Sequence, residues 1–191
     1  MMNDESKLRM PEFTPSGRLL VRRPSRDDLD DVFRIHGDPR TNVHNLAGPG
    51  RDFGPCRKLL DTWLAHWDTY GFGYWVVEIA DTTRIDHRVG AVVGFSGVRH
   101  GVWLGRPVLN LYYRFALEAW GHGYASEVAR YAVQWATTNH PDLPVLARTR
   151  PGNIASRRVA EAVGLVRQPD LEADDGHGPL VVFGQPMAGP T

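Results

Sequence analysis

Apolar residues recur at helical spacing in four stretches of the chain. Residues three and four apart share a face of an α-helix, so this recurrence predicts helices with one buried side. The most regular stretch runs from about His122 to Thr138, and its apolar stripe consists of Tyr124, Val128, Ala132 and Trp135. The four predicted helices cover residues 29–36, 59–67, 122–138 and 153–163.

Short apolar or alternating stretches separate these helices and predict strands. Residues 108–115 alternate apolar side chains with Asn110, Tyr112 and Arg114, as a strand with two different faces does. The predicted strands cover residues 18–23, 74–80, 89–98, 108–115, 145–149, 165–168 and 180–183, with a polar turn at 81–88. The order β-α-α-β-β-β-α-β-α-β-β predicts an α/β fold, a mixed sheet covered by helices.

Length and charge fit a single domain of balanced charge. A chain of 191 residues can bury one good core. We expect a flexible N-terminal arm over residues 1–17, one domain over 18–185 and a flexible tail over 186–191. Lys plus Arg and Asp plus Glu number 22 each, so no global field favours nucleic acid or a membrane surface as a partner.

Compartment is predicted from what the chain lacks. We find no signal-peptide h-region and no run of roughly 18 apolar residues. The single cysteine, Cys56, cannot form an intramolecular disulfide. These features together predict a cytoplasmic protein without membrane association.

A glycine-rich turn joins a predicted strand to the most regular helix. It consists of Trp120, Gly121, His122, Gly123, Tyr124 and Ala125. Glycine lets a ligand approach the backbone, and a helix start offers unpaired N–H groups to an anion such as pyrophosphate. Ser126 stands where a Rossmann turn needs its third glycine, and the spacing and lysine of a Walker loop are missing. A plain tight turn is the alternative interpretation.

A second strand-to-helix junction carries polar side chains. Asn153 is a predicted helix N-cap, and Ser156 lies three residues further along the helix. The structural interpretation is a capped helix followed by a surface turn. The functional one is an amide and a hydroxyl placed beside the anion-binding turn.

Together the two segments resemble the GNAT N-acetyltransferases, especially their RimJ/RimL-like branch. The signature W-G-x-G-Y-A-x-E is present over residues 120–127, and N-x-x-S-x-R-V-x-E-x-x-G-[FL] over 153–165. The opening stretch 19–22 and the turn 37–39 also look like this branch, so the resemblance spans about residues 18–184.

The resemblance implies a fold, a cosubstrate and site residues. Two central parallel strands, near 108–115 and 145–149, would splay apart and hold the pantetheine of acetyl-CoA between them. Backbone N–H groups of Trp120, Gly121, His122, Gly123, Tyr124 and Ala125 would bind the pyrophosphate. Asn153 would contact pantetheine, and Ser156 would protonate the departing thiolate. The acceptor would be a primary amine on a protein N-terminus or a small molecule, and no metal is implied.

The chain departs from the family pattern at positions that bear on catalysis. Many GNAT enzymes have a tyrosine acid where this chain has Ala160, which favours Ser156 as the acid. Asn110 stands where many RimL-like members have an acidic residue, and Tyr112 where they have glycine, so a narrowed acceptor pocket is expected.

The base that deprotonates the amine is open between two candidates. His44 lies in a predicted loop that borders the acceptor site in the resembled family, and an imidazole can accept a proton near neutral pH. The other candidate is Glu78 on a predicted strand. For each, a solvated residue without catalytic function is the alternative.

Two rival functions stay open at this stage. One is an acyl-CoA-binding module without turnover, and the other is an enzyme of the same fold that uses an antibiotic amine or a longer acyl donor. A homodimer is left open as well.

Overall fold

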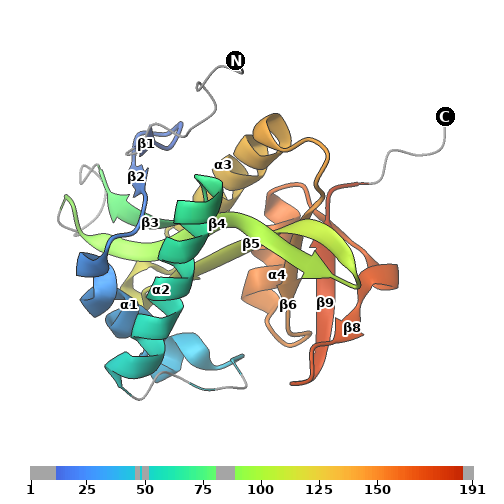
Figure 1. The fold of residues 1–191 in the computed structure, drawn as a ribbon, viewed down its shortest axis with the longest axis horizontal. Coiled ribbons are helices and arrows are strands. Elements are labelled where there is room, and N and C mark those ends of the chain that lie inside the picture. Colours follow the sequence, from blue (N-terminus) through green and yellow to red (C-terminus); the bar gives the residue numbers. More distant parts are fainter. Residues whose placement is uncertain (1–11, 46–47, 49–51, 81–88, 187–191) are drawn as a thin grey trace.

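The computed structural model describes residues 12–45, 48, 52–80 and 89–186, and its strands form one mixed sheet (Figure 1). The strand order is β1-β2-β3-β4-β5-β6-β9-β7, and β8 pairs with β9. The strands are β1 Glu12–Phe13, β2 Leu19–Arg22, β3 Tyr74–Ile79, β4 Val92–Trp103, β5 Arg106–Phe115, β6 Val145–Thr149, β7 Val166–Arg167, β8 Ala173–Asp174 and β9 Pro179–Gly184.

Helices cover both faces of the sheet. This is necessary because successive apolar side chains of its central strands point to opposite faces. They are α1 Leu29–His36, α2 Phe53–Tyr70, α3 Tyr124–Asn139 and α4 Ile154–Ala162, with short 3₁₀ helices at Arg26–Asp28, Pro39–Asn42, Leu117–Ala119 and Pro169–Leu171. On β3, Tyr74 and Val76 pack against α1 and α2, whereas Trp75 and Val77 pack in the core that contains α3. The predicted α/β fold is confirmed.

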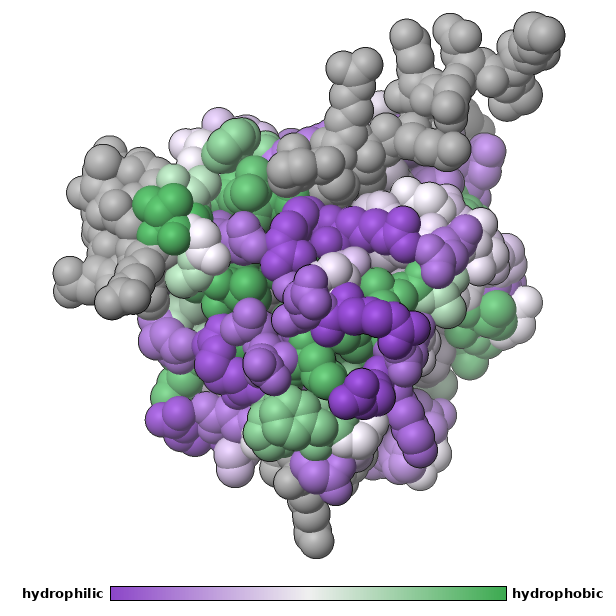
Figure 2. Space-filling model, turned by 60° about the vertical axis from the view of Figure 1, so that its left-hand side comes forward, coloured by the Kyte–Doolittle hydropathy of each residue, from purple (hydrophilic) through white to green (hydrophobic). Residues whose placement is uncertain are grey.

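The outer surface beside α1 and α2 is mixed in character. In the view of Figure 2, hydrophobic side chains lie in separate small patches among hydrophilic ones. Among the described residues, no helix is long and apolar enough to cross a membrane.

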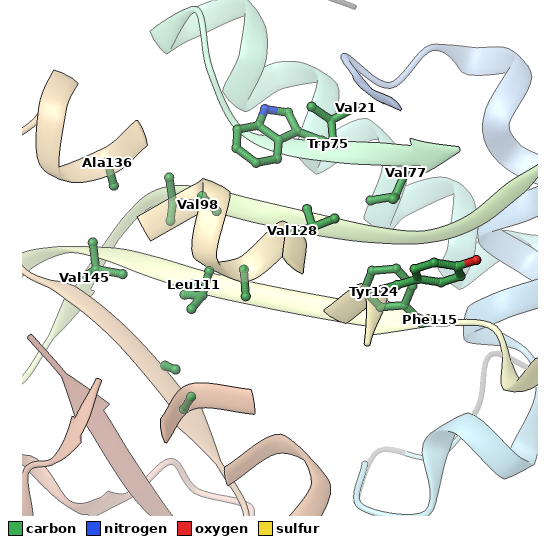
Figure 3. Packing of buried hydrophobic residues seen from close by; sticks show 14 of the residues in the cluster. Val21, Trp75, Val77, Val98, Leu111, Phe115, Tyr124, Val128, Ala136 and Val145 are labelled. Atoms are coloured by element: carbon green, nitrogen blue, oxygen red, sulfur yellow. The ribbon is translucent and has the colours of Figure 1, made fainter. Parts of the chain in front are cut away.

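Helix α3 packs on the middle of the sheet (Figure 3). Tyr124, Val128 and Ala132 of its predicted stripe are fully buried, and Trp135 is partly buried at the edge of the same core. The helix begins at Tyr124 rather than at the predicted His122 because Gly123 is its N-cap, with a left-handed φ of 78°.

The two central parallel strands separate, which confirms the predicted splay. Strand β5 pairs in parallel with β6 at Leu109–Val145, Asn110–Leu146 and Leu111–Ala147, and no further. Beyond these pairs β5 continues to Phe115 and β6 to Thr149, and the two diverge (Figure 1). Backbone groups of both strands are therefore left without each other as partners along one side.

Part of the predicted N-terminal arm is tied to the domain. Strand β1 pairs with β2, and the hydroxyls of Thr14 and Ser16 donate to the Glu127 carboxylate at 2.6 and 2.5 Å. Residues 12–17 therefore belong to the folded unit, in contrast to the expectation for residues 1–17. Residues 1–11 lie outside the described residues, as do residues 187–191 of the predicted tail and the predicted turn at 81–88.

Other elements differ in extent from the sequence prediction; for example, α2 covers Phe53–Tyr70 rather than residues 59–67. Strand β4 runs to Trp103, beyond the predicted end at residue 98, because it forms a hairpin with β5 through Leu104 and Gly105. Both turn residues have positive φ, 49° and 76°, as a tight two-residue hairpin turn requires. Strand β8 was not predicted, and it consists of only two residues.

Candidate active site

A cleft of about 880 Å³ opens where β5 and β6 separate. Both strands line it from their last paired residues onward, through residues 111–115 of β5 and 147–149 of β6. The turn before α3, the start of α4, Arg40, Thr41 and residues 43–45 also line the cleft. The cleft therefore gathers the two junctions that the sequence singled out.

The glycine turn at one end of the cleft is suited to an anion. Gly121 and Gly123 have φ of 81° and 78°, and an added Cβ on either would meet nothing within 4 Å. Their backbone conformation, and not crowding, thus favours glycine here. As N-cap, Gly123 makes no side-chain cap hydrogen bond, so the first N–H groups of α3 are left for a ligand at the positive end of the helix dipole.

The predicted cosubstrate-binding residues of this turn do not all face the cleft. Trp120, Gly121, Gly123, Tyr124 and Ala125 line it. His122 is not among the lining residues; its side chain is exposed and its carbonyl accepts from Arg18 Nη1 at 3.4 Å.

Asn153 and Ser156 lie together at the start of α4, and both line the cleft. Asn153 Oδ1 accepts from the backbone N–H of Ser156 at 3.0 Å, which confirms Asn153 as the N-cap. Since Asn153 caps the helix, the Ser156 hydroxyl is not used for that purpose. It lies instead 3.0 Å from the hydroxyl of Tyr113.

Tyr113 of β5 is a site residue that the sequence analysis missed. Its hydroxyl donates to the Ser156 carbonyl oxygen at 2.8 Å, and burial raises the pKa of Tyr113 to about 12. The phenol is therefore protonated at neutral pH. In the sequence it counted as one member of the apolar face of β5, and only the packing of α4 on that face brings Ser156 to it.

The structure separates the two candidate bases. His44 lines the cleft and is exposed, just after the 3₁₀ helix Pro39–Asn42. Glu78 does not line the cleft, and its carboxylate accepts from Arg22 Nε at 2.6 Å. Its side chain is 15% exposed, so it is neither a solvated residue nor a base for the cleft.

Tyr112, which precedes Tyr113 on β5, is held in place by a buried histidine. Tyr112 lines the cleft, and its hydroxyl lies 2.7 Å from Nε2 of buried His36, whose Nδ1 lies 3.1 Å from the Val32 carbonyl. Burial, and then the charge of Arg114, lowers the pKa of His36 to about 3. The imidazole is thus neutral: its Nδ1–H donates to the Val32 carbonyl, and its Nε2 accepts a hydrogen bond from the Tyr112 hydroxyl. Neither group is a base at neutral pH.

Comparison with known proteins now places the chain. Residues 18–166 match the acetyltransferase (GNAT) domain family. The chain belongs to the GNAT acetyltransferase family. The separated strands, the uncapped start of α3 and the second junction are thus features of a GNAT domain. Among the described residues, no group of three or more His, Cys, Asp or Glu side chains is placed to hold a metal ion.

Solved structures share this fold at low sequence identity. An acetyltransferase from Agrobacterium tumefaciens str. C58 is 22% identical with a TM-score of 0.75, over 93% of this chain and 94% of that one. A putative GNAT-family acetyltransferase from Bordetella pertussis is 18% identical with a TM-score of 0.73, over 93% and 100%. Spermidine N-acetyltransferase from Vibrio cholerae, in complex with CoA and spermine, is 16% identical with a TM-score of 0.64, over 87% and 94%.

A curated relative matches part of the chain. It is the uncharacterized protein YkkB from Bacillus subtilis (strain 168), 33% identical over 96 residues, which are 50% of this chain and 52% of that protein. The matching part thus spans about half the length of this relative.

Proposed function

We propose that this GNAT protein transfers the acetyl group of acetyl-CoA to a primary amine, by direct attack while both are bound. One observation carries the proposal: the cleft between β5 and β6 runs from the uncapped N-terminus of α3 to the hydroxyl of Ser156. An anion site and a proton donor at the two parts of one cleft suit a substrate with a phosphate end and a thioester end.

The chain's own residues divide the binding of acetyl-CoA among them. The N–H groups around Gly121, Gly123 and Ala125 would hold the pyrophosphate. The unpaired edges of β5 and β6 would hydrogen-bond the pantetheine amides, as a neighbouring strand does. Asn153 uses its carbonyl oxygen as the helix cap, so its amide nitrogen is left for a pantetheine carbonyl.

Transfer needs one bond made, one broken and two protons moved. The amine nitrogen bonds to the acyl carbon, the carbon–sulfur bond breaks, and the sulfur keeps the bonding electron pair. Ser156 Oγ would give the thiolate its proton and regain one from solvent, while the hydroxyl of Tyr113, 3.0 Å away, would position Ser156 Oγ. The amine must lose a proton, and His44 is the candidate acceptor on the cleft wall.

The decisive experiment measures thiol release from acetyl-CoA with a panel of primary amines, together with acetyl-CoA affinity by calorimetry. We expect amine-dependent thiol release. Tight acetyl-CoA binding without thiol release from any amine would identify a binding module without turnover instead. Repeating the assay with longer acyl-CoA donors and with aminoglycosides tests the second rival.

We also propose that the protein belongs to the RimJ/RimL-like branch of the family and is cytoplasmic, and we leave a homodimer open. The signatures over residues 120–127 and 153–165 support the RimJ/RimL-like branch, for which a protein N-terminus joins the amine panel. The free, buried thiol of Cys56 is consistent with a cytoplasmic protein. A homodimer stays a prediction, and light scattering at working concentration tests it against a monomer of 21.4 kDa.

A further inference from the structure

The charged residues that line the cleft are all basic. Arg40, Arg114, Arg148 and Arg150 are lining residues, and among the described residues of the wall none is Asp or Glu. The whole chain has equal numbers of acidic and basic residues, 22 of each, so this excess is local to the cleft.

Two of these arginines have carboxylate partners, and two do not. Arg40 pairs with Asp38 at 2.7 Å and Arg150 with Asp175 at 2.8 Å. Arg114 and Arg148 are held by amide oxygens instead, and within the described part of the chain no carboxylate lies at ion-pair distance from either. An amide oxygen fixes the direction of a guanidinium and leaves its full charge in place.

Arg148 of β6 is firmly positioned. Its Nε and Nη2 donate to Asn110 Oδ1 at 3.2 and 2.9 Å, and its guanidinium lies over the Trp103 ring at 4.4 Å from the centroid. Burial lowers the pKa of this guanidinium, an effect of desolvation that an anionic ligand would offset. The remaining Nη1 has no partner among the described residues.

Arg114 adds a second charge further along β5. Its Nη1 donates to Asn42 Oδ1 at 2.6 Å. After burial, its charge also contributes to the lowered pKa of His36, whose imidazole lies 2.7 Å from the Tyr112 hydroxyl.

Both arginines lie on the face of the sheet opposite to the proposed proton donor. Arg148 of β6 bonds to Asn110, which shares a face of β5 with Tyr112 and Arg114. Successive side chains of a strand point to opposite faces, so Arg114 and Tyr112 face away from Tyr113, which contacts Ser156 on α4. The amine attacks above or below the plane of the thioester carbonyl. Helices α3 and α4 pack on the Tyr113 face of β5, so the amine enters from the other face. The uncompensated charges therefore lie on the acceptor's side of the reacting carbon.

We propose that the acceptor of this enzyme is an amine that also bears an anionic group, a carboxylate or a phosphate, and that Arg148 binds this group with support from Arg114. The inference rests on the proposed function and adds its substrate class. Guanidinium matches both anions through paired, charge-assisted hydrogen bonds. Polycationic amines such as spermidine would meet repulsion in the same cleft.

The test compares matched amines that differ in one anionic group. Suitable pairs are an α-amino acid with its amide and phosphoethanolamine with ethanolamine, with spermidine as the cationic member. We expect kcat/KM to be about 10- to 100-fold higher for the anionic member of at least one pair. This ratio corresponds to the usual contribution of a hydrogen bond to a charged group. The pair that shows this ratio distinguishes carboxylate from phosphate. Equal rates within both pairs, or a preference for spermidine, would overturn the proposal.

Arg148→Met removes the charge and keeps an unbranched side chain against Trp103. It should lower kcat/KM for the anionic amine to that of its neutral partner, while acetyl-CoA affinity is retained. Arg106→Met, at an exposed site of β5 outside the cleft, is the matched control and should keep the preference. Arg148→Gln serves in its place if circular dichroism shows that the methionine variant is misfolded. A matching loss of acetyl-CoA affinity would assign Arg148 to the donor and overturn the inference.

Failure of the enzyme activity can be told apart from failure of this inference. Calorimetry with the anionic amine and the protein saturated with CoA needs no turnover. If the wild type binds the anionic amine, Arg148→Met does not, and neither releases thiol in the kinetic assay, the transferase proposal is overturned and the anion site is retained. Turnover without any anionic preference would do the reverse.

Discussion

The Ser156 hydroxyl has a different environment from that of an ordinary helix-start serine. Asn153 already caps α4, so the Ser156 Oγ has only Tyr113 as a described side-chain partner, and both hydroxyls border the cleft. The capping interpretation of Ser156 can therefore be separated from the catalytic one, because Asn153 caps the helix and only the Ser156 hydroxyl is proposed to act in catalysis.

Ser156→Ala should lower kcat by roughly 10- to 100-fold, the low end for general-acid assistance, because thiolate is a good leaving group. This corresponds to about 1.4–2.7 kcal/mol of barrier. The melting temperature should change little because the cap is intact, and acetyl-CoA affinity should be retained. Measuring kcat and melting temperature on the same preparation decides the point, since full activity would remove Ser156 from the mechanism.

In the proposed mechanism Tyr113 acts through Ser156 as a positioning residue. Tyr113→Phe keeps the ring and should lower kcat by less than Ser156→Ala does. The double variant should be no slower than Ser156→Ala alone, because residues that act as one unit are not additive. Tyr131→Phe on α3, whose hydroxyl contacts Glu12 away from the cleft, is the matched control. Additive losses in kcat would mean that Tyr113 has a separate function.

His44 can be tested by the shape of the pH profile. If it accepts the amine proton, kcat/KM of the wild type falls on the acidic side, and His44→Ala loses that limb together with rate. His122→Ala is the control, an exposed histidine near the cleft that is not among its lining residues. Identical profiles for wild type and His44→Ala would assign the proton transfer to water or to another group.

At the scale of elements, the turn before α3 combines two left-handed glycines with a helix start that has no side-chain cap. The backbone conformation, the open space beside each Cα and the free N–H groups all favour a bound anion. A side chain at Gly121 would strain the turn and stand where the ligand approaches.

Gly121→Ala should weaken acetyl-CoA binding at least 10-fold in a folded protein. Gly164→Ala is a close control: its φ is 87°, its Cβ would also meet nothing within 4 Å, and it lies outside the cleft. Both variants carry the left-handed penalty of about 1–2 kcal/mol, so they should lose similar thermal stability. Only Gly121→Ala should lose affinity in titration calorimetry, and equal affinities would show that the turn does not bind the cosubstrate.

The sequence predicted those elements whose cause is local. The stripe of α3, the Asn153 cap and the alternation of β5 all follow from residues within one or two turns of each other. Strand β1 could not be predicted in this way, since the partners that hold its segment include Glu127, more than a hundred residues away. The same holds for Tyr113 with Ser156 and for Arg148 with Asn110, because each pair exists only through the packing of distant elements.

At the scale of the whole molecule, several histidines are packed as neutral groups. His36 lies beneath the cleft between α1 and the sheet. His66, His100 and His140 lie together where α2, β4 and the end of α3 meet, with ring centroids 6.0 Å apart for the first pair and 5.7 Å for the second. Burial lowers the pKa of all four. His66 accepts from the backbone N–H of His100 at 3.0 Å, a bond that protonation of Nε2 would break.

Folding stability should therefore fall as the pH drops below the ordinary histidine value of 6.5. Below pH 6.5 the histidines of the unfolded chain bind protons, whereas the buried histidines of the folded chain stay neutral. Each buried histidine therefore stabilises the fold above pH 6.5, and this stabilisation is lost as the pH falls toward the folded-state pKa, which is about 3 for His36. The pKa of Asp28 and of Glu127 is lowered from ordinary values of 3.8 and 4.5, so the stability that these carboxylates contribute is lost mainly below pH 5. The loss between pH 6.5 and 5 therefore belongs mainly to the histidines. Urea unfolding across this range should show His36→Gln less stable at pH 7.5 but with a flatter slope, by up to about 1.4 kcal/mol per pH unit. A wild-type free energy of unfolding that is flat from pH 7.5 to 5 would contradict the neutral packing of these rings.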